Sequence, residues 1–202
     1  MVGQHLKFSQ KHDETCSDCK NTIYEFLRKI YGNVKFDYKV RLSTNIEHYK
    51  KHPYYKYINN ILKKLKKSDS FVKTRYLTRC DFFVVKQKII VELDESQHFT
   101  KARKLSLKNY PKNIKLGFDK NEWVHFCDKL NRMDRDPIYK KRDRDERRAW
   151  YDTLKDIIPL MNGFKPTIRI YMGNFKWCSL NPENENDIKI FKEKLRLKYG
   201  QK

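Results

Sequence analysis

The chain has 202 residues, 39% of them hydrophobic and 14% aromatic, which suits one domain with a packed core and excludes a disordered chain. Lys and Arg total 46 against 25 Asp and Glu, so the net charge of +21 predicts a polyanionic partner, nucleic acid above all. No apolar stretch suits a secretory signal or a membrane span, and the five scattered cysteines fit a reducing compartment, so we expect a cytoplasmic protein without a membrane partner.

Hydrophobic periodicity predicts, in chain order, a helix, a strand, a helix, a β-hairpin, a basic segment, a helix, a strand and a final helix. Their approximate ranges are 22–31, 34–42, 54–67, 79–94, 99–142, 143–158, 167–172 and 186–198. The basic segment is expected to be irregular, with one short helix near 121–130. This order predicts an α/β (α+β) fold in which flanking helices cover a central mixed sheet.

Individual residues predict where two of the helices begin and end. Thr22 and Glu25 have the T-x-x-E spacing of a capping box, and Gly32 follows the first helix as a C-terminal cap. Pro159 is expected to end or kink the helix of residues 143–158, because proline lacks the N–H donor that a helix interior requires.

Residues 1–20 are expected to be a polar N-terminal segment, and residues 21–202 a single domain with the basic insert at about 99–142. The N-terminal segment contains Cys16-x-x-Cys19, the spacing of a zinc knuckle. A second pair at matching spacing is missing, so unstructured thiols are the alternative to a Zn²⁺ site. Other residues that could complete a site are His5, His12, Cys80 and Cys127.

The β-hairpin of residues 79–94 places acidic residues together. If Lys86 and Gln87 form a two-residue turn, Asp81 lies directly opposite Glu92, and Asp94 shares their face. The other face is apolar and is the predicted core face; it carries Phe82, Val84, Ile89, Val91 and Leu93. One extra residue in the turn would break the pairing and leave the acids at a solvated strand end.

Three carboxylates at one end of a half-buried hairpin repel one another, so the arrangement calls for a cation. Oxygen ligands of this kind suit Mg²⁺ or Mn²⁺. Beside a bound phosphate backbone, such an ion can activate a water and stabilise charge on the phosphoryl oxygens. The sequence therefore predicts a metal site built on Asp81, Glu92 and Asp94.

The segment DFFVVKQKIIVELDESQHF resembles the core motif of the PD-(D/E)XK nuclease superfamily, and it is most similar to the very-short-patch-repair-like branch. The matching residues are Asp81, Glu92, Asp94 and His98. Three flanking features are also similar: the T-x-x-E helix, the helix RDERRAWYDTLKD, and Gly163 followed by the strand TIRIY. The resemblance implies a restriction-endonuclease-like core and a Mg²⁺-dependent endonuclease that hydrolyses DNA, of restriction or repair type.

The resemblance and the hairpin geometry together suggest a role for each residue. Asp81 and Glu92 would bind the metal, with the Leu93 carbonyl as a third ligand, and Asp94 would orient the attacking water or bind a second ion. His98 would be a general base or a phosphate contact, the alternative being a polar residue at a strand end.

The chain departs from the superfamily pattern at two positions. Asp94 stands where the superfamily has its lysine, and Glu95 stands where a glycine usually follows. The lysine's role is then vacant, moved elsewhere, or taken by His98. Glu25 would approach the metal by resemblance, and its alternative role is the capping box.

Basic residues after the hairpin are candidates for contacts with phosphates, the alternative being a solvated basic loop. They are Lys101, Arg103, Lys104 and Lys108, joined by Arg147 and Arg169. The resemblance favours DNA over RNA, which charge alone does not decide, and a homodimer would suit cleavage of a palindromic site. The rival functions are a catalytically inactive DNA- or RNA-binding protein and an RNA-binding accessory protein.

Overall fold

The computed structural model of the chain describes residues 13–66, 71–130 and 143–196. Its centre is a sheet of four strands, whose spatial order is β1 (Val34–Tyr38), β2 (Cys80–Val84), β3 (Ile89–Asp94) and β4 (Ile168–Tyr171). The first three strands form an antiparallel meander, and β4 lies parallel to β3. The predicted α/β class with a central mixed sheet is therefore confirmed.

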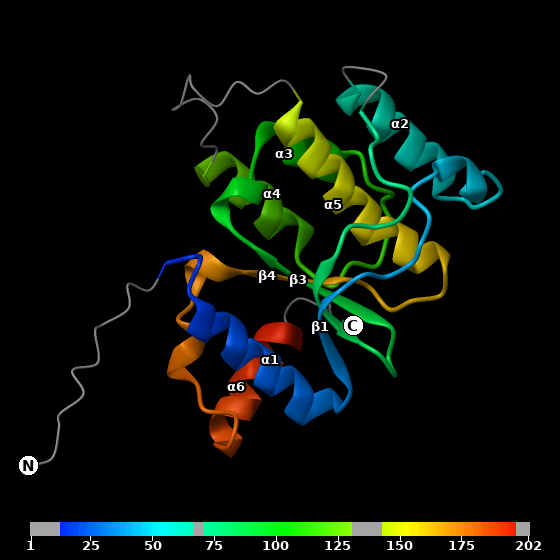
Figure 1. The fold of residues 1–202 in the computed structure, drawn as a ribbon. Helices are drawn as coiled ribbons and strands as arrows, with labels where there is room; N and C mark the ends of the chain where they lie inside the picture. The colour runs from blue at the N-terminus through cyan, green and yellow to red at the C-terminus, as the bar shows by residue number, and fades with distance from the viewer. Residues whose placement is uncertain (1–12, 67–70, 131–142, 197–202) are drawn as a thin grey trace, which may run out of the picture.

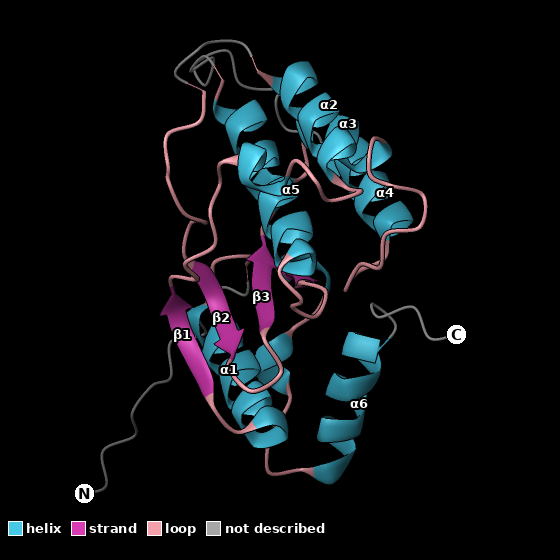
Figure 2. Cartoon of the chain, turned by 90° about the vertical axis from the view of Figure 1, so that its right-hand side faces the viewer, coloured by secondary structure: helices cyan, strands magenta, loops and turns pink. Residues whose placement is uncertain are grey.

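Helices cover both faces of this sheet (Figure 1). One face carries α1 (Ser17–Tyr31) and α6 (Glu185–Arg196), and the other carries α2 (Tyr55–Leu65), α3 (Lys101–Lys108), α4 (Lys120–Leu130) and α5 (Arg144–Met161). Figure 2 shows α5 rising from the sheet beside α2, α3 and α4, with α1 and α6 on the opposite side. Short 3-10 turns are η1 (Ile46–Tyr49), η2 (Ser96–His98), η5 (Met172–Asn174) and η6 (Trp177–Ser179). None of the helices in the described ranges is long and apolar enough to cross a membrane.

The sheet separates two hydrophobic cores, and β3 contributes to both. Ile89 and Val91 pack toward α1 and α6, whereas Ile90 packs toward α5. Both faces of the strand are covered, so the expectation of one core face and one half-exposed acidic face is wrong. The reason is α5, whose apolar stripe around Trp150 and Leu154 closes over the face that carries the acids.

The first helix begins earlier than predicted. α1 starts at Ser17 with Cys16 as its N-cap, so Thr22 and Glu25 lie inside the helix and the predicted capping box is wrong. Cys16 and Cys19 are buried in the core, which makes the start of α1 part of the domain rather than a separate polar segment. At the other end, Gly32 caps the helix at φ 78°, as predicted, and donates its N–H to the Arg28 carbonyl at 2.8 Å.

The start of the basic insert is helical, which the sequence pattern did not predict. Thr100 caps α3 by accepting the Arg103 N–H at 3.2 Å. The amphipathic pattern of α3 is hidden in the sequence, because Arg103 and Ser106 lie on its buried face beside Leu107. The helix predicted near 121–130 is α4, and residues 131–142 lie outside the described part of the chain.

The helix α5 continues through Pro159 to Met161, so of the two predicted alternatives, an end or a kink at the proline, the end is wrong. Proline cannot donate to the carbonyl four residues earlier, which belongs to Lys155. The Thr167 hydroxyl donates to that carbonyl instead, at 2.6 Å. The bond satisfies the carbonyl and joins α5 to the residue just before β4. A smaller difference concerns β1, which ends at Tyr38 rather than at residue 42.

Candidate active site

The hairpin pairs as predicted. Phe82 lies opposite Val91 and Val84 opposite Ile89, which brings Asp81 level with Glu92 one step beyond the last pairs. At this point the backbone N–H of Leu93 donates to Asp81 Oδ2 at 2.9 Å. The carboxylate of Asp81 is therefore held at the end of the hairpin by the main chain of the opposite strand.

Asp81 also has a cationic partner from the helix on the far side of the sheet. Its Oδ1 accepts a hydrogen bond from the Lys20 ammonium at 2.6 Å. The side chains are 23% exposed for Asp81 and 34% exposed for Lys20. Solvent, or a ligand, therefore reaches the acidic end of the hairpin from the side of these two residues.

Glu92 is far less accessible, at 4% exposure. Its Oε2 accepts a hydrogen bond from Lys155 Nζ at 2.7 Å, and the same ammonium donates to the Arg79 carbonyl at 2.8 Å. Its Oε1 is buried and has no hydrogen-bond partner among residues 13–66, 71–130 and 143–196. Burial raises the pKa of Glu92 to about 7, although the nearby charges of Lys155 and Arg169 act to lower it.

Asp94 lies deeper still, at 1% exposure. Arg169 donates to its Oδ1 and the Trp123 indole N–H donates to its Oδ2, both at 2.7 Å. Both oxygens are thus engaged by side chains from β4 and α4, which fix the orientation of the carboxylate. Asp94 lies in a buried ionic network, whereas Asp81 and Glu92 lie beside it.

Arg169 is the centre of that network. Besides Asp94, its guanidinium binds Asp156 at 2.7 Å and Asp152 at 3.2 Å, both on α5. Arg103 binds the other oxygen of Asp156 at 2.7 Å. Arg103 and Arg169 are 1% and 0% exposed, so the prediction that they contact nucleic acid is wrong. A guanidinium held this firmly inside the protein cannot also reach a phosphate in solution.

His98 joins the network from the turn after β3. Its Nδ1 lies 3.0 Å from Asp152 Oδ2 and 3.6 Å from Asp94 Oδ1. Burial lowers the pKa of His98, but the charges of Asp152 and Asp94 outweigh burial and the net pKa is raised. Ligand atoms of these three residues lie within 4.8 Å of one another, close enough to hold a cation. Arg169, however, already donates hydrogen bonds to both carboxylates.

Among the other predicted site residues, Glu25 lies apart from Asp81 and Glu92, and Leu93 lies beside them. Glu25 is on the exposed face of α1, where it pairs with Arg28 at 3.5 Å rather than with any residue of the acidic end. Leu93 packs its side chain into the core on the α1 side and donates its N–H to Asp81. The metal-binding role of its carbonyl stays a prediction.

The predicted phosphate-binding lysines lie on α3. Lys101, Lys104 and Lys108 line a shallow groove together with Lys64 of α2. Lys104 forms an ion pair with Asp128 of α4. Lys101 and Lys108 are exposed, so they are placed to meet a polyanion. Arg147 on α5 is partly buried, and its Nε donates to the Asp143 carbonyl at 3.3 Å.

Sequence reasoning missed the partners that helices supply to the carboxylates. Lys155 and Lys20 are separated from Glu92 and Asp81 by 63 and 61 positions, so no local pattern joins them. One signal was available in α5. Asp152, Lys155 and Asp156 recur at helical spacing along its apolar stripe, and polar residues on an inward face indicate a buried network.

The two cysteines of the predicted zinc knuckle lie at the start of α1, and a third cysteine joins them. The Sγ atoms of Cys16, Cys19 and Cys178 all lie within 4.8 Å of one another. The distant Cys80 and Cys127 do not belong to this group, and His5 and His12 lie outside the described residues.

Comparisons of this chain with protein-family models, with curated proteins and with solved structures found no match in any of the three.

Proposed function

We propose that this protein is a Mg²⁺- or Mn²⁺-dependent endonuclease that hydrolyses phosphodiester bonds of DNA, with Asp81 and Glu92 as its metal-binding carboxylates. The observation that carries the proposal is Glu92 Oε1, a buried oxygen without a hydrogen-bond partner in the described residues, on a carboxylate level with Asp81. Buried polar atoms are nearly always paired, so an unpaired carboxylate oxygen leaves a place for a water or a cation. Oxygen donors from two carboxylates fit a hard divalent cation.

A bound divalent ion supplies an activated water and compensates charge on the phosphoryl oxygens. The protein's own residues hold the carboxylates in place. The Leu93 N–H orients Asp81, and Lys155 holds Glu92 while its own ammonium is fixed by the Arg79 carbonyl. Asp94 occupies the position where the superfamily has a lysine. We assign the role of that lysine to Lys155, whose ammonium is in direct contact with the buried carboxylate of Glu92.

Lys20 has a different place in the proposed reaction. It contacts Asp81 on the accessible side, where a phosphodiester would approach. A partly exposed ammonium at this position can bind a phosphate oxygen before the chemical step and neutralise negative charge as the bond breaks. The ionic network around Arg169 acts indirectly, because it holds β3, β4 and α5 together and thereby fixes the distance between Glu92 and Lys155.

Three further features support the proposal. The net charge of +21 favours a polyanion, and the lysines of α3 follow the acidic end of β3 by only a short turn. The chain order α1, β1, β2, β3, α5 and β4 also agrees with the order of the motifs that resemble the PD-(D/E)XK superfamily, with α2 inserted after β1 and with α3 and α4 inserted after β3. The preference for DNA over RNA rests on that resemblance.

One observation favours a second candidate function, a nucleic-acid-binding protein without catalysis. Asp81 and Glu92 each hold a lysine ammonium already. Two such ion pairs compensate the two carboxylates without any metal. In that case the lysines would be structural partners, and the basic surface alone would carry the function.

Cleavage of supercoiled plasmid separates these candidates. We expect nicking or linearisation by the wild type with Mg²⁺ or Mn²⁺ but not with EDTA, and a loss of about 100-fold or more in Asp81→Asn and Glu92→Gln. Glu183→Gln, an exposed carboxylate that pairs with Lys29, is the matched control and should cleave normally. Plasmid binding without cleavage in any metal would support the inactive binding protein. The same cleavage assay on single-stranded RNA shows whether the substrate is DNA or RNA.

A further inference from the structure

Three cysteines that are distant in the sequence meet at the start of α1. Cys16 is the N-cap, Cys19 lies in the first turn, and Cys178 belongs to η6 between β4 and α6. Their sulfur atoms lie within 4.8 Å of one another, and all five cysteines of the chain are thiols rather than disulfides. Neither the acidic end of the hairpin nor the basic surface uses this group.

The surroundings of the sulfurs suit thiolate ligands. The Cys19 N–H donates to Cys16 Sγ at 3.4 Å, and the Cys178 N–H donates to Cys19 Sγ at 3.4 Å. Backbone N–H groups aimed at sulfur stabilise negative charge on it and hold the ligand in orientation. The positive end of the α1 dipole adds to this effect, since two of the thiols lie in or beside the first turn.

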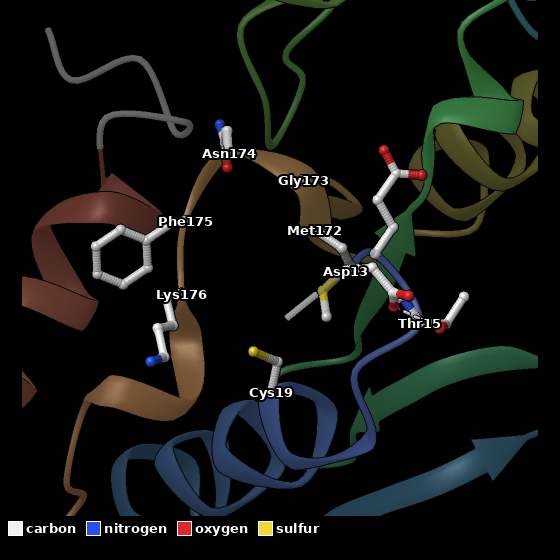
Figure 3. Close-up of a pocket in the computed structure, with 9 residues that line it drawn as sticks. Asp13, Thr15, Cys19, Met172, Gly173, Asn174, Phe175 and Lys176 are labelled. Atoms are coloured by element: carbon white, nitrogen blue, oxygen red, sulfur yellow. Dashed lines mark hydrogen bonds between the residues drawn. The ribbon is translucent and has the colours of Figure 1, made fainter. Parts of the chain in front are cut away.

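A cavity lies directly beside this group (Figure 3). Cys19 directs its sulfur into the cavity, between the segment of Asp13 to Thr15 and the segment of Met172 to Lys176. Cation binding would release protons from the thiols, and the cavity leaves room for a water molecule as a further ligand.

We propose that Cys16, Cys19 and Cys178 bind one Zn²⁺ ion as thiolates, and that the ion ties the start of α1 to the segment between β4 and α6. Sulfur donors select zinc over Mg²⁺, and a water from the cavity completes four-coordination. The zinc site does not depend on the proposed nuclease function. It lies close to that site in the sequence, because Lys20 follows Cys19 directly and contacts Asp81.

Metal content tests the proposal without any activity measurement. We expect protein purified under reducing conditions to contain about one zinc per chain, measured by elemental mass spectrometry. Replacement of the Zn²⁺ ion by Co²⁺ should give a thiolate-to-cobalt charge-transfer band in the near ultraviolet. Cys178→Ser should weaken zinc binding by about 10- to 100-fold or more. Cys127→Ser, a buried thiol outside the group, is the matched control and should bind as the wild type does.

A second measurement keeps the proposal testable if Cys178→Ser does not fold. A strong zinc chelator should lower the melting temperature of the wild type and of Cys127→Ser, because the ion stabilises only the folded chain. Absence of a thiolate-to-cobalt band in the folded wild type would overturn the proposal. So would equal zinc binding by Cys178→Ser and Cys127→Ser.

Discussion

The buried charges around Arg169 nearly cancel, and the protonation state of His98 determines whether one negative charge stays uncompensated. Within the described residues, three buried carboxylates of the network face two buried cations. The carboxylates are Asp94, Asp152 and Asp156, and the cations are Arg103 and Arg169. A protonated His98 supplies the missing positive charge and places it beside Asp152, whose Oδ2 lies 3.0 Å from His98 Nδ1. Burying an unpaired charge is costly, so protonation of His98 stabilises the fold.

The pH dependence of stability follows from this protonation. The pKa of His98 is raised in the folded chain above its ordinary value of 6.5, because Asp152 and Asp94 outweigh burial and the opposing charge of Arg169. Its contribution to stability is therefore fully present below about pH 6.5 and is lost as the pH rises through the folded-state pKa. We expect the free energy of unfolding of the wild type to fall with rising pH more steeply than that of His98→Gln.

Urea denaturation between about pH 6 and about pH 9 measures this difference, with the two chains compared at each pH. The wild-type advantage should shrink toward the alkaline end. His48→Gln, on an exposed turn, is a control that should follow the wild-type curve. Parallel curves for the wild type and His98→Gln would show that His98 does not change its protonation on folding.

At the scale of elements, the bond between Thr167 and the Lys155 carbonyl allows α5 to pass through Pro159. Thr167→Val keeps the side-chain shape and removes the hydroxyl, so a buried carbonyl loses its donor. The expected cost is about 1 to 3 kcal/mol in the free energy of unfolding. Chemical denaturation of the wild type and the variant measures it.

A second substitution makes this test specific. Pro159→Ala gives back an N–H at the position that normally donates to the Lys155 carbonyl. Thr167→Val should therefore cost less in the Pro159→Ala background than in the wild type. A double-mutant cycle isolates the coupling from the separate effect of proline on the unfolded chain. Independent, additive costs would mean that the hydroxyl does not replace the missing backbone donor.

The hairpin shows how far sequence reasoning reaches at this scale. The pairing of Asp81 with Glu92 could be predicted, because side chains alternate with a period of two and a short turn sets the register. The residues that cover the acidic face could not be predicted, because they come from other elements. Lys155 reaches Glu92 from α5, and Lys20 reaches Asp81 from α1. Arg103 was misassigned for the same reason, because basic residues are taken as exposed unless a buried partner such as Asp156 is known.

At the scale of the whole molecule, the cysteine group and the acidic end of the hairpin both depend on packing between distant segments. α1 meets the segment after β4 through Cys178, and it meets β2 through Lys20. The sequence showed the Cys16-x-x-Cys19 spacing but no sign of the third thiol, 159 positions away from Cys19. Sequence spacing indicates sites within one segment, whereas sites shared between segments appear only once the chain is folded.

The net charge of +21 leads to a prediction about binding that does not depend on cleavage. If α3 holds the phosphate backbone, Lys101→Ala combined with Lys108→Ala should weaken binding to duplex DNA and reduce its salt dependence. Each lost phosphate contact lowers the slope of log K against log salt concentration by about 0.9, so the double variant should lose about 1.8. Fluorescence anisotropy of a labelled duplex over a series of salt concentrations measures both quantities.

The matched control removes the same charge from the other side of the sheet. Lys189→Ala combined with Lys192→Ala takes two exposed lysines from α6, so both double variants have the same net charge. A general attraction to the whole basic molecule would lower affinity equally in the two variants, whereas a defined surface on α3 makes the loss specific to Lys101 and Lys108. Equal salt slopes in the two variants would exclude α3 as the main contact and leave DNA binding to the rest of the basic surface, including the exposed lysines of α2.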